Sequence, residues 1–343
     1  MKTNMETEIF SQTKVIKDLR EKYIKNGKIN FNIDFNFEEI KFIASGSSYN
    51  AIRLGYKFFE NYTSKRISFE YASEFISNLN KKIKKDTLYC FMSQSGETFD
   101  TKCALEIVKK EGGKTLAFVN NSDSAIYNLA DYKADMLAGV ENSIAATKSF
   151  LSGVLCLWFF ALMYSGKNTE TEISNGLREA CLAVENVLSD TASIKKIGKN
   201  LSTKEKLSII GYNYGYILAK ELALKIKETS YIDTTAYPTG EFLHGHTAIL
   251  NTNKTLIEIF TDNMIPFEEN TLHKIRQDFD PEIVAITDKE TELKNVIKFG
   301  KYKTEIAKIC AITVILQLLA LEIAKSKGCD ADKPIGLNKV VRG

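Results

Sequence analysis

The feature that most constrains the fold is a pattern that occurs twice along the chain: an apolar run, a turn of small residues and a helical stretch. The first copy is FIASGSS at 42–48, and the second is LSIIGYNYG at 207–215. Continuous apolar strands that alternate with helices are typical of a parallel sheet covered by helices on both faces. The pattern therefore predicts an α/β chain that contains two similar doubly wound domains.

Short apolar runs predict the strands, and longer periodic stretches predict the helices. The expected strands are residues 40–45, 87–93, 114–120, 207–212, 255–261 and 282–287. The expected helices are residues 49–59, 98–111, 143–164 and 216–229. The most apolar stretches, 150–164 and 306–321, are shorter than the roughly 20 residues that a membrane span needs, so we expect two buried helices.

Composition excludes several classes of function. The chain has 343 residues and a net charge of +3, without a basic cluster that contains aromatic residues, so we expect no nucleic-acid partner. Six scattered cysteines without a CxxC pair fit reduced thiols, and with three histidines in all we expect no metal site. The charged N-terminus lacks the apolar core of a signal peptide, so we expect a cytoplasmic protein that does not bind membranes.

A hydroxyl-rich turn, SQSGET at 93–98, follows one expected strand and begins a helix. Ligands of open parallel sheets bind at the carboxyl ends of strands, where helix N-termini offer amide groups and a partial positive charge. The turn at 46–48, which contains Ser47 and Ser48, ends another strand of the same half. Together the two turns predict a phosphate-binding cradle, and the alternative is a helix cap of the capping-box type.

A polar stripe lies on the helix expected at 216–229. At about 100° per residue, Glu221, Lys225 and Glu228 project between aliphatic positions on both sides, whereas the solvated face of the helix points elsewhere. One interpretation is a set of ordinary ion pairs. The other is a partly buried carboxylate beside a lysine, which is suited to proton transfer. A loop with Glu241, His244 and His246 follows and adds candidate acid–base groups.

Four segments together resemble a known family. They are GSSYN at 46–50, SQSGET at 93–98, ATK at 146–148 and ELALKIKETSYIDTTAYPTGEFLHG at 221–245. They are similar to the sugar isomerase (SIS) family, and in particular to the isomerase half of glucosamine-6-phosphate synthase. The segments 5–12 and 332–339 extend the resemblance over nearly the whole chain. It implies two tandem SIS domains, each with a flavodoxin-like parallel sheet flanked by helices, in a homodimer with a shared active site.

The resemblance also implies which residues bind the substrate, a phosphorylated sugar or amino sugar. The sugar would lie against the backbone of Ile144 and the side chain of Thr147. The phosphate would be held by Ser47, Ser48, Ser93, Gln94, Ser95 and Thr98. No cofactor is implied.

The same resemblance implies three catalytic residues. Glu228 would move a proton between C1 and C2, His244 would open the sugar ring from the other subunit, and Lys339 would act on the open-chain sugar. Supporting side chains would be those of Glu221, Lys225 and Glu241. From the residues themselves, Lys339 is suited either to a Schiff base or to stabilising an enediolate.

The chain departs from the synthase in ways that bear on its substrate. We expect no glutamine-hydrolysing domain, because the resemblance covers the isomerase half alone, and we therefore expect a glutamine-independent enzyme. The function we predict is a phosphosugar isomerase or an amino-sugar-phosphate deaminase that acts by aldose–ketose proton transfer. The alternatives are a deglycase of a phosphorylated amino-acid–sugar conjugate and a non-catalytic sugar-phosphate sensor.

The expected organisation has five parts. Residues 1–27 form an N-terminal helical segment, and residues 166–198 form a helical connector. Residues 28–165 are the first SIS domain, with the phosphate cradle, and residues 199–325 are the second, with Glu228 and His244. Residues 326–343 form a C-terminal tail that enters the active site.

Overall fold

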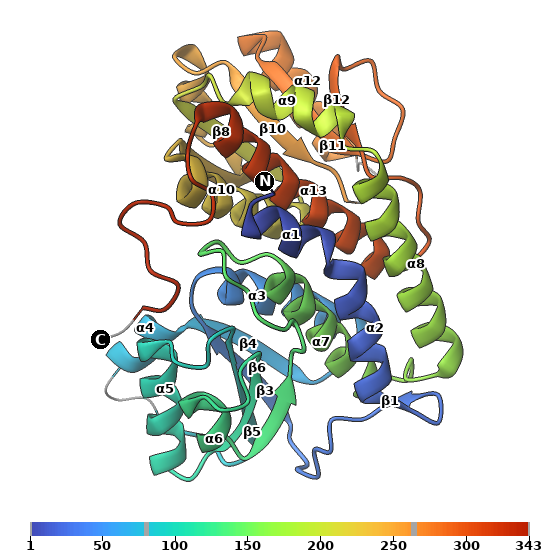
Figure 1. Ribbon diagram of the computed structural model, residues 1–343, viewed down its shortest axis with the longest axis vertical. Helices are drawn as coiled ribbons and strands as arrows, with labels where there is room; N and C mark the ends of the chain where they lie inside the picture. The colour runs from blue at the N-terminus through green and yellow to red at the C-terminus, as the bar shows by residue number, and fades with distance from the viewer. Residues whose placement is uncertain (1, 79–81, 262–265, 342–343) are drawn as a thin grey trace. The chain divides into compact units, whose positions relative to one another are not determined.

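The computed structural model describes residues 2–78, 82–261 and 266–341 (Figure 1). The chain divides into two compact units, and each is described here by itself. The first-sheet unit comprises Ser11–Glu141, Ala146–Leu177 and Asn338–Gly343. The second-sheet unit comprises Met1–Phe10, Asn142–Ala145 and Arg178–Leu337.

A five-stranded parallel sheet forms the centre of the first-sheet unit, with the strand order β4-β3-β5-β6-β7. Numbered along the chain this order is 2-1-3-4-5, which is flavodoxin-like and places the topological switch point between β3 and β5. The strands are β3 (Glu39–Ala44), β4 (Arg66–Tyr71), β5 (Thr87–Ser93), β6 (Lys114–Val119) and β7 (Tyr132–Asp135). The remaining elements are α2 (Gln12–Tyr23), β1 (Ile24–Lys25), β2 (Lys28–Ile29), α3 (Gly46–Tyr62), α4 (Ala72–Ser77), α5 (Phe99–Lys110), α6 (Ala125–Leu129) and α7 (Lys148–Met163).

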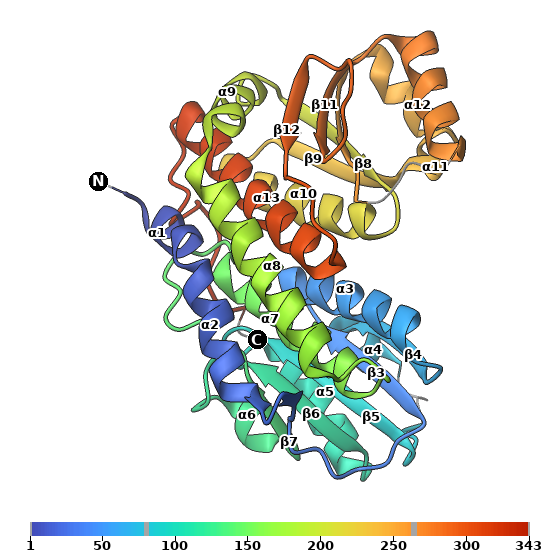
Figure 2. The same cartoon turned by 90° about the vertical axis from the view of Figure 1, so that its right-hand side faces the viewer.

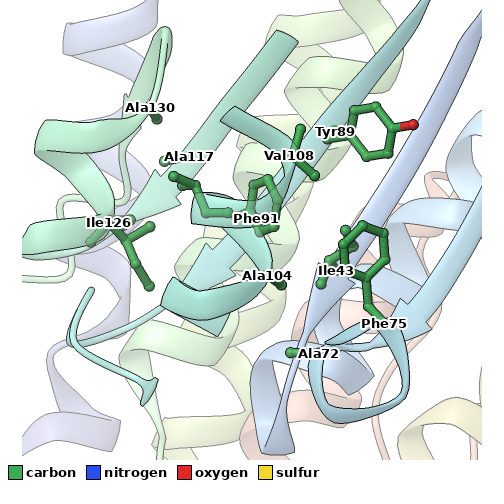
Figure 3. Packing of buried hydrophobic residues seen from close by; sticks show 12 residues of the cluster. Ile43, Ala72, Phe75, Tyr89, Phe91, Ala104, Val108, Ala117, Ile126 and Ala130 are labelled. Atoms are coloured by element: carbon green, nitrogen blue, oxygen red, sulfur yellow. The ribbon is translucent and has the colours of Figure 1, made fainter. Parts of the chain in front are cut away.

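Helices cover both faces of this sheet. On one face, Phe75 of α4, Val108 of α5 and Ile126 of α6 pack with Phe91 of β5 in a buried apolar cluster (Figure 3). On the other face, α3 and α7 bring aromatic rings against Phe42 of β3. All seven residues of β5 are buried, as expected for a central strand covered on both sides.

The second-sheet unit repeats this topology. Its parallel sheet has the order β12-β11-β10-β8-β9. Read from β9 and numbered along the chain, this order is again 2-1-3-4-5. Figure 2 shows α11 and α12 on one side of the sheet and α9, α10 and α13 on the other. The strands are β8 (Lys206–Gly211), β9 (Asp233–Pro238), β10 (Thr255–Ile259), β11 (Glu282–Thr287) and β12 (Asn295–Lys298). The helices are α1 (Asn4–Phe10), α9 (Ala192–Leu201), α10 (Tyr214–Ser230), α11 (Thr239–Phe242), η1 (His246–Asn251), α12 (Pro266–Phe279) and α13 (Glu305–Lys327), while α8 (Glu170–Ser189) has residues in both units.

The predicted α/β class with parallel sheets is confirmed. The six expected strands and three of the four expected helices are present with ends within three residues of those predicted. The start of the fourth helix was predicted wrongly: α7 begins at Lys148 rather than at residue 143. Six strands of the described chain were missed. Four of them, β4, β7, β9 and β12, are the edge strands of the two five-stranded sheets, and the other two, β1 and β2, form a short antiparallel pair. Edge strands are only partly covered, so they lack the continuous apolar run that marks a central strand.

The two most apolar stretches form buried helices, as expected. In the part of the chain that the structure describes, α13 is long and apolar enough to cross a membrane, and its most apolar window is 89% buried inside the protein. Residues 149–162 of α7 are buried without exception. All six cysteines are free thiols.

Candidate functional site

The predicted cradle lies at the switch point of the first sheet. In the parallel register Ala44 of β3 pairs with Met92 of β5, so the two strands end at the same level. The turn after β3 begins α3 at Gly46, and the turn after β5 begins α5 at Phe99. A hydrogen bond of 2.7 Å from the Ser45 hydroxyl to the Asp100 carboxylate joins the turn after β3 to the first turn of α5. Both turns therefore contribute to one edge of the sheet, where ligands of this topology bind.

Hydrogen bonds within the 93–98 turn hold its hydroxyl groups in place. The Ser93 Oγ and Thr98 Oγ1 atoms are 2.9 Å apart, and the Gly96 amide donates to Ser93 Oγ over 3.0 Å. The Glu97 amide donates to Ser95 Oγ over 3.1 Å. The side chains of Ser45 and Thr98, the N-cap residues, make no capping hydrogen bond to the amides of α3 and α5. The turn is therefore shaped in advance, and its geometry differs from a capping box.

Gly96 is the residue on which the shape of this turn depends. Its φ of +68° lies in the left-handed region, and a Cβ atom there would lie 1.9 Å from Ser124 Oγ and 2.7 Å from Val119 Cγ1. The neighbouring residue also holds the turn against this segment, because the Glu97 carboxylate accepts a hydrogen bond of 2.7 Å from the Ala125 amide. Neither the conformation nor the space admits a side chain at position 96.

The corresponding turn of the second sheet is closed by close packing. A Cβ atom at Gly215 would lie 2.4 Å from the Ile259 carbonyl oxygen, so the first turn of α10 sits directly against the end of β10. A Cβ atom at Gly46, in the first unit, would meet nothing within 4 Å. At the starts of these two helices, the first copy of the repeat is therefore open at Gly46, whereas the second is packed against backbone at Gly215.

The remaining residues predicted to bind the phosphate or the sugar are divided between the two units: all belong to the first-sheet unit except Ile144. Ser47 and Ser48 lie half-buried in the first turn of α3, and Gln94 is half-buried in the turn after β5. Thr147, the N-cap residue of α7, is fully buried. Ile144 belongs to the second-sheet unit, where its amide donates a 3.1 Å hydrogen bond to the Asp332 carbonyl oxygen.

Sequence reasoning missed Glu141, which is the partner of Lys339. The Lys339 Nζ atom lies 2.7 Å from Glu141 Oε2, and the Glu141 side chain is 0% exposed. Thr147 and Ser149 also donate to this carboxylate. Burial would raise the pKa of Glu141, but the Lys339 ammonium and the other donors outweigh it and hold that pKa below its ordinary value.

The polar stripe of α10 lies in the second-sheet unit. Lys225 Nζ is 2.5 Å from Glu228 Oε2 and 3.6 Å from Glu221 Oε1. The side chains of Lys225 and Glu221 are 1% and 3% exposed, whereas that of Glu228 is 22% exposed. The structure thus brings the three predicted residues together and leaves Glu228 as the member that reaches the surface of its unit.

In the described residues, no side-chain hydrogen bond or ion pair joins His244 or Glu241 of the predicted acid–base loop to this stripe. His244 and Glu241 are exposed, and in the described part of the chain their side chains make no hydrogen bond or ion pair. His246 lies against the Tyr237 ring with 4.4 Å between the ring centroids. The His244 side chain thus extends into solvent from its own unit.

Comparison with known proteins identifies an SIS domain and relatives of this chain. A model of the SIS domain matches residues 36–163, which contain the cradle. Over 98% of this chain, the sequence is 34% identical to the isomerizing glutamine–fructose-6-phosphate aminotransferase of Campylobacter jejuni and 32% identical to that of Wigglesworthia glossinidia brevipalpis. The chain spans 58% of the length of each of these relatives.

Solved structures give the same result. The C-terminal domain of glucosamine-fructose-6-phosphate aminotransferase from Francisella tularensis has a TM-score of 0.89 and 26% identity, and the match covers 97% of this chain and 98% of that one. Glucosamine-6-phosphate deaminase from Thermotoga maritima shares the fold, with a TM-score of 0.79 and 21% identity over 99% of both chains. Residues 36–163 therefore match an SIS (sugar isomerase) domain, and the chain is homologous to the isomerase half of the aminotransferases.

Proposed function

We propose that this protein is a phosphosugar isomerase or an amino-sugar-phosphate deaminase that moves a proton between C1 and C2. The observation that carries the proposal is the preformed hydroxyl turn at 93–98, which lies at the switch point of the first sheet and at the N-terminus of α5. Such a turn suits a phosphate dianion. A phosphate held there supplies binding energy remote from the reacting carbons, and this energy can be used to orient them.

The proton transfer is assigned to Glu228. A general base for carbon acids must present a carboxylate that the substrate can reach, and Glu228 is the exposed end of a stripe whose other members are buried. Lys225, 2.5 Å away, holds that carboxylate in one orientation. His244 would open the cyclic sugar, and Lys339 would act on the open-chain carbonyl.

The repeated topology supports a proposal for the domain organisation. Because both sheets have the strand order 2-1-3-4-5, we assign a second SIS domain to residues 199–325, beside the first at residues 28–165. We also propose a homodimer in which His244 serves the partner's site, which accords with its exposed position and lack of partners in its own unit. A cytoplasmic location and catalysis without glutamine complete the proposal.

The deciding experiment is an assay of the purified chain, without glutamine, on 2-amino-sugar phosphates and ketose phosphates. Release of ammonia, or interconversion of aldose and ketose, supports the proposal when the Glu228→Gln variant lacks it. Release of an amino acid from a phosphorylated sugar conjugate would replace the proposal with a deglycase. Tight binding of a phosphosugar with no turnover of any substrate would replace it with a sensor.

A further inference from the structure

The carboxylate of Glu141 joins two segments that are distant in sequence. Its Oε1 atom accepts hydrogen bonds from the Thr147 amide at 3.0 Å, the Thr147 hydroxyl at 3.1 Å and the Ser149 amide at 3.1 Å. Its Oε2 atom accepts from the Ser149 hydroxyl at 2.7 Å and from Lys339 Nζ at 2.7 Å. One oxygen therefore organises the start of α7, and the other also holds the C-terminal tail.

We propose that Glu141 is a positioning residue that fixes the ammonium group of Lys339 and the hydroxyl group of Thr147 for the reaction. This inference rests on the proposed function, in which Lys339 acts on the open-chain sugar and Thr147 lines the sugar site. Glu141 itself is buried and acts through these two residues, without a contact of its own to the substrate.

The Glu141–Lys339 ion pair anchors the tail within its own unit. Residues 338–341 are the described part of the tail in the first-sheet unit, and they form no helix or strand. Their contacts in that unit include the Glu141–Lys339 ion pair and a 3.2 Å hydrogen bond from the Phe99 amide to the Val341 carbonyl oxygen. Phe99 is the first residue of α5, so the tail is fixed to the helix that follows the cradle. A long, flexible lysine side chain gains most from a fixed, buried counter-ion.

Because the two oxygens of Glu141 have different partners, a substitution can separate its contact with Lys339 from its contacts with the start of α7. Glu141→Gln keeps the shape of the side chain, and its amide oxygen can still accept from Thr147 and Ser149. Its NH₂ group cannot accept from the Lys339 ammonium, because both groups are donors. The variant therefore releases the lysine while it preserves the start of α7. The matched control is Ser149→Ala, which removes a donor from the same carboxylate and leaves the ion pair intact.

The first test needs no substrate. The wild type and both variants are treated with an amine-acetylating reagent, and the rate at Lys339 is measured by peptide mass spectrometry, with exposed Lys110 as the internal reference. We expect the Lys339 rate to rise several-fold in Glu141→Gln and to stay near wild type in Ser149→Ala. Equal Lys339 rates in the wild type and Glu141→Gln would overturn the proposal.

The second test uses the phosphosugar that the wild type converts. We expect Glu141→Gln to lower kcat about tenfold or more with little change in KM, because a misplaced group costs rate more than affinity. A double variant with Lys339→Met should be no slower than Lys339→Met alone, since Glu141 acts through Lys339. If the losses in kcat of the two single variants multiply in the double variant, Glu141 does not act through Lys339. If the wild type converts no phosphosugar, the proposed function fails, and the acetylation rates still decide whether Glu141 positions Lys339.

Discussion

In α10, Lys225 Nζ lies 2.5 Å from Glu228 Oε2, one helical turn further along the chain. The lysine side chain is 1% exposed, and that of Glu228 is 22% exposed. Removing one member of a buried ion pair is costly, because the other charge is left without its partner. The pair therefore ties a surface carboxylate to a buried cation, which fixes where the carboxylate can point.

Replacing Glu228 by Gln should abolish most of the activity while the fold remains. The amide keeps the size of the side chain but cannot accept a proton from carbon, so turnover should fall by roughly a hundredfold or more. Phosphosugar affinity, measured by calorimetry, should change little, because the cradle belongs to the other unit. Lys227→Gln, at an exposed position of the same helix, is the control and should keep wild-type turnover. A Glu228→Gln variant with near wild-type turnover would show that the stripe is a set of structural ion pairs.

Gly96→Ala should remove phosphate binding. The new Cβ atom would lie 1.9 Å from Ser124 Oγ in a residue whose φ is +68°, so the 93–98 turn must move. We expect a loss of stability of about 1–3 kcal/mol and the loss of measurable phosphosugar affinity. The control is Gly112→Ala, at the other end of α5, where φ is +77° and a Cβ atom meets nothing within 4 Å. That variant carries the conformational strain alone and should bind phosphosugar normally, so equal binding by the two variants would place the phosphate elsewhere.

Glu258 is a buried acid in β10. It is 1% exposed, and among the described residues neither of its carboxyl oxygens has a hydrogen-bond partner. Burial, and secondly the charge of Glu268, raises the pKa of Glu258 well above its ordinary value of 4.5. Glu258 is therefore a neutral acid in the folded protein at pH values where it is ionised in the unfolded chain.

This acid makes stability fall as the pH rises. Below pH 4.5 the carboxyl group is protonated in both states and costs nothing extra. Above it, the folded state binds one more proton than the unfolded state, so the free energy of unfolding falls by up to about 1.4 kcal/mol per pH unit until the folded pKa is reached. Glu258→Leu should remove this slope, so its gain over wild type in urea denaturation should be larger at pH 8 than at pH 5.

Glu282 on the neighbouring strand provides a control of opposite sign. Hydrogen bonding to Lys204 outweighs burial and lowers its pKa, so its contribution to stability is present above pH 4.5 and is lost as the pH falls. Glu282→Gln should therefore destabilise the protein more at pH 7 than at pH 4. A Glu258→Leu variant whose gain in stability is the same at pH 5 and pH 8 would show that the Glu258 acid is ionised in the fold.

A mixing experiment tests whether His244 serves the partner subunit. Glu228→Gln and His244→Asn are each expected to be inactive on cyclic substrate. If both residues of a site come from one chain, mixed dimers stay inactive. If His244 crosses to the partner, each mixed dimer has one intact site, and random reassociation of equal amounts should restore about a quarter of wild-type activity. Light scattering that shows a fully active monomer would exclude the shared site.

Local sequence indicated the central strands, the helices α3, α5, α7, α10 and α13, and the positions of the predicted cradle and of the stripe. The apolar run at 87–93 indicated a central strand, and the turn rich in Ser, Thr and Gly at its end marked the predicted cradle. The stripe followed from helical periodicity alone, because Glu221, Lys225 and Glu228 are three and four residues apart.

Tertiary structure decided what depends on distant partners. The helix expected from residue 143 begins at Lys148, because the Glu141 carboxylate takes the Thr147 and Ser149 amides and the Ile144 amide donates to Asp332. Lys339 is 198 residues from Glu141, and no periodicity links positions that far apart. The edge strands were missed for a similar reason, since pairing with one neighbour, and not an apolar run, is what makes them strands.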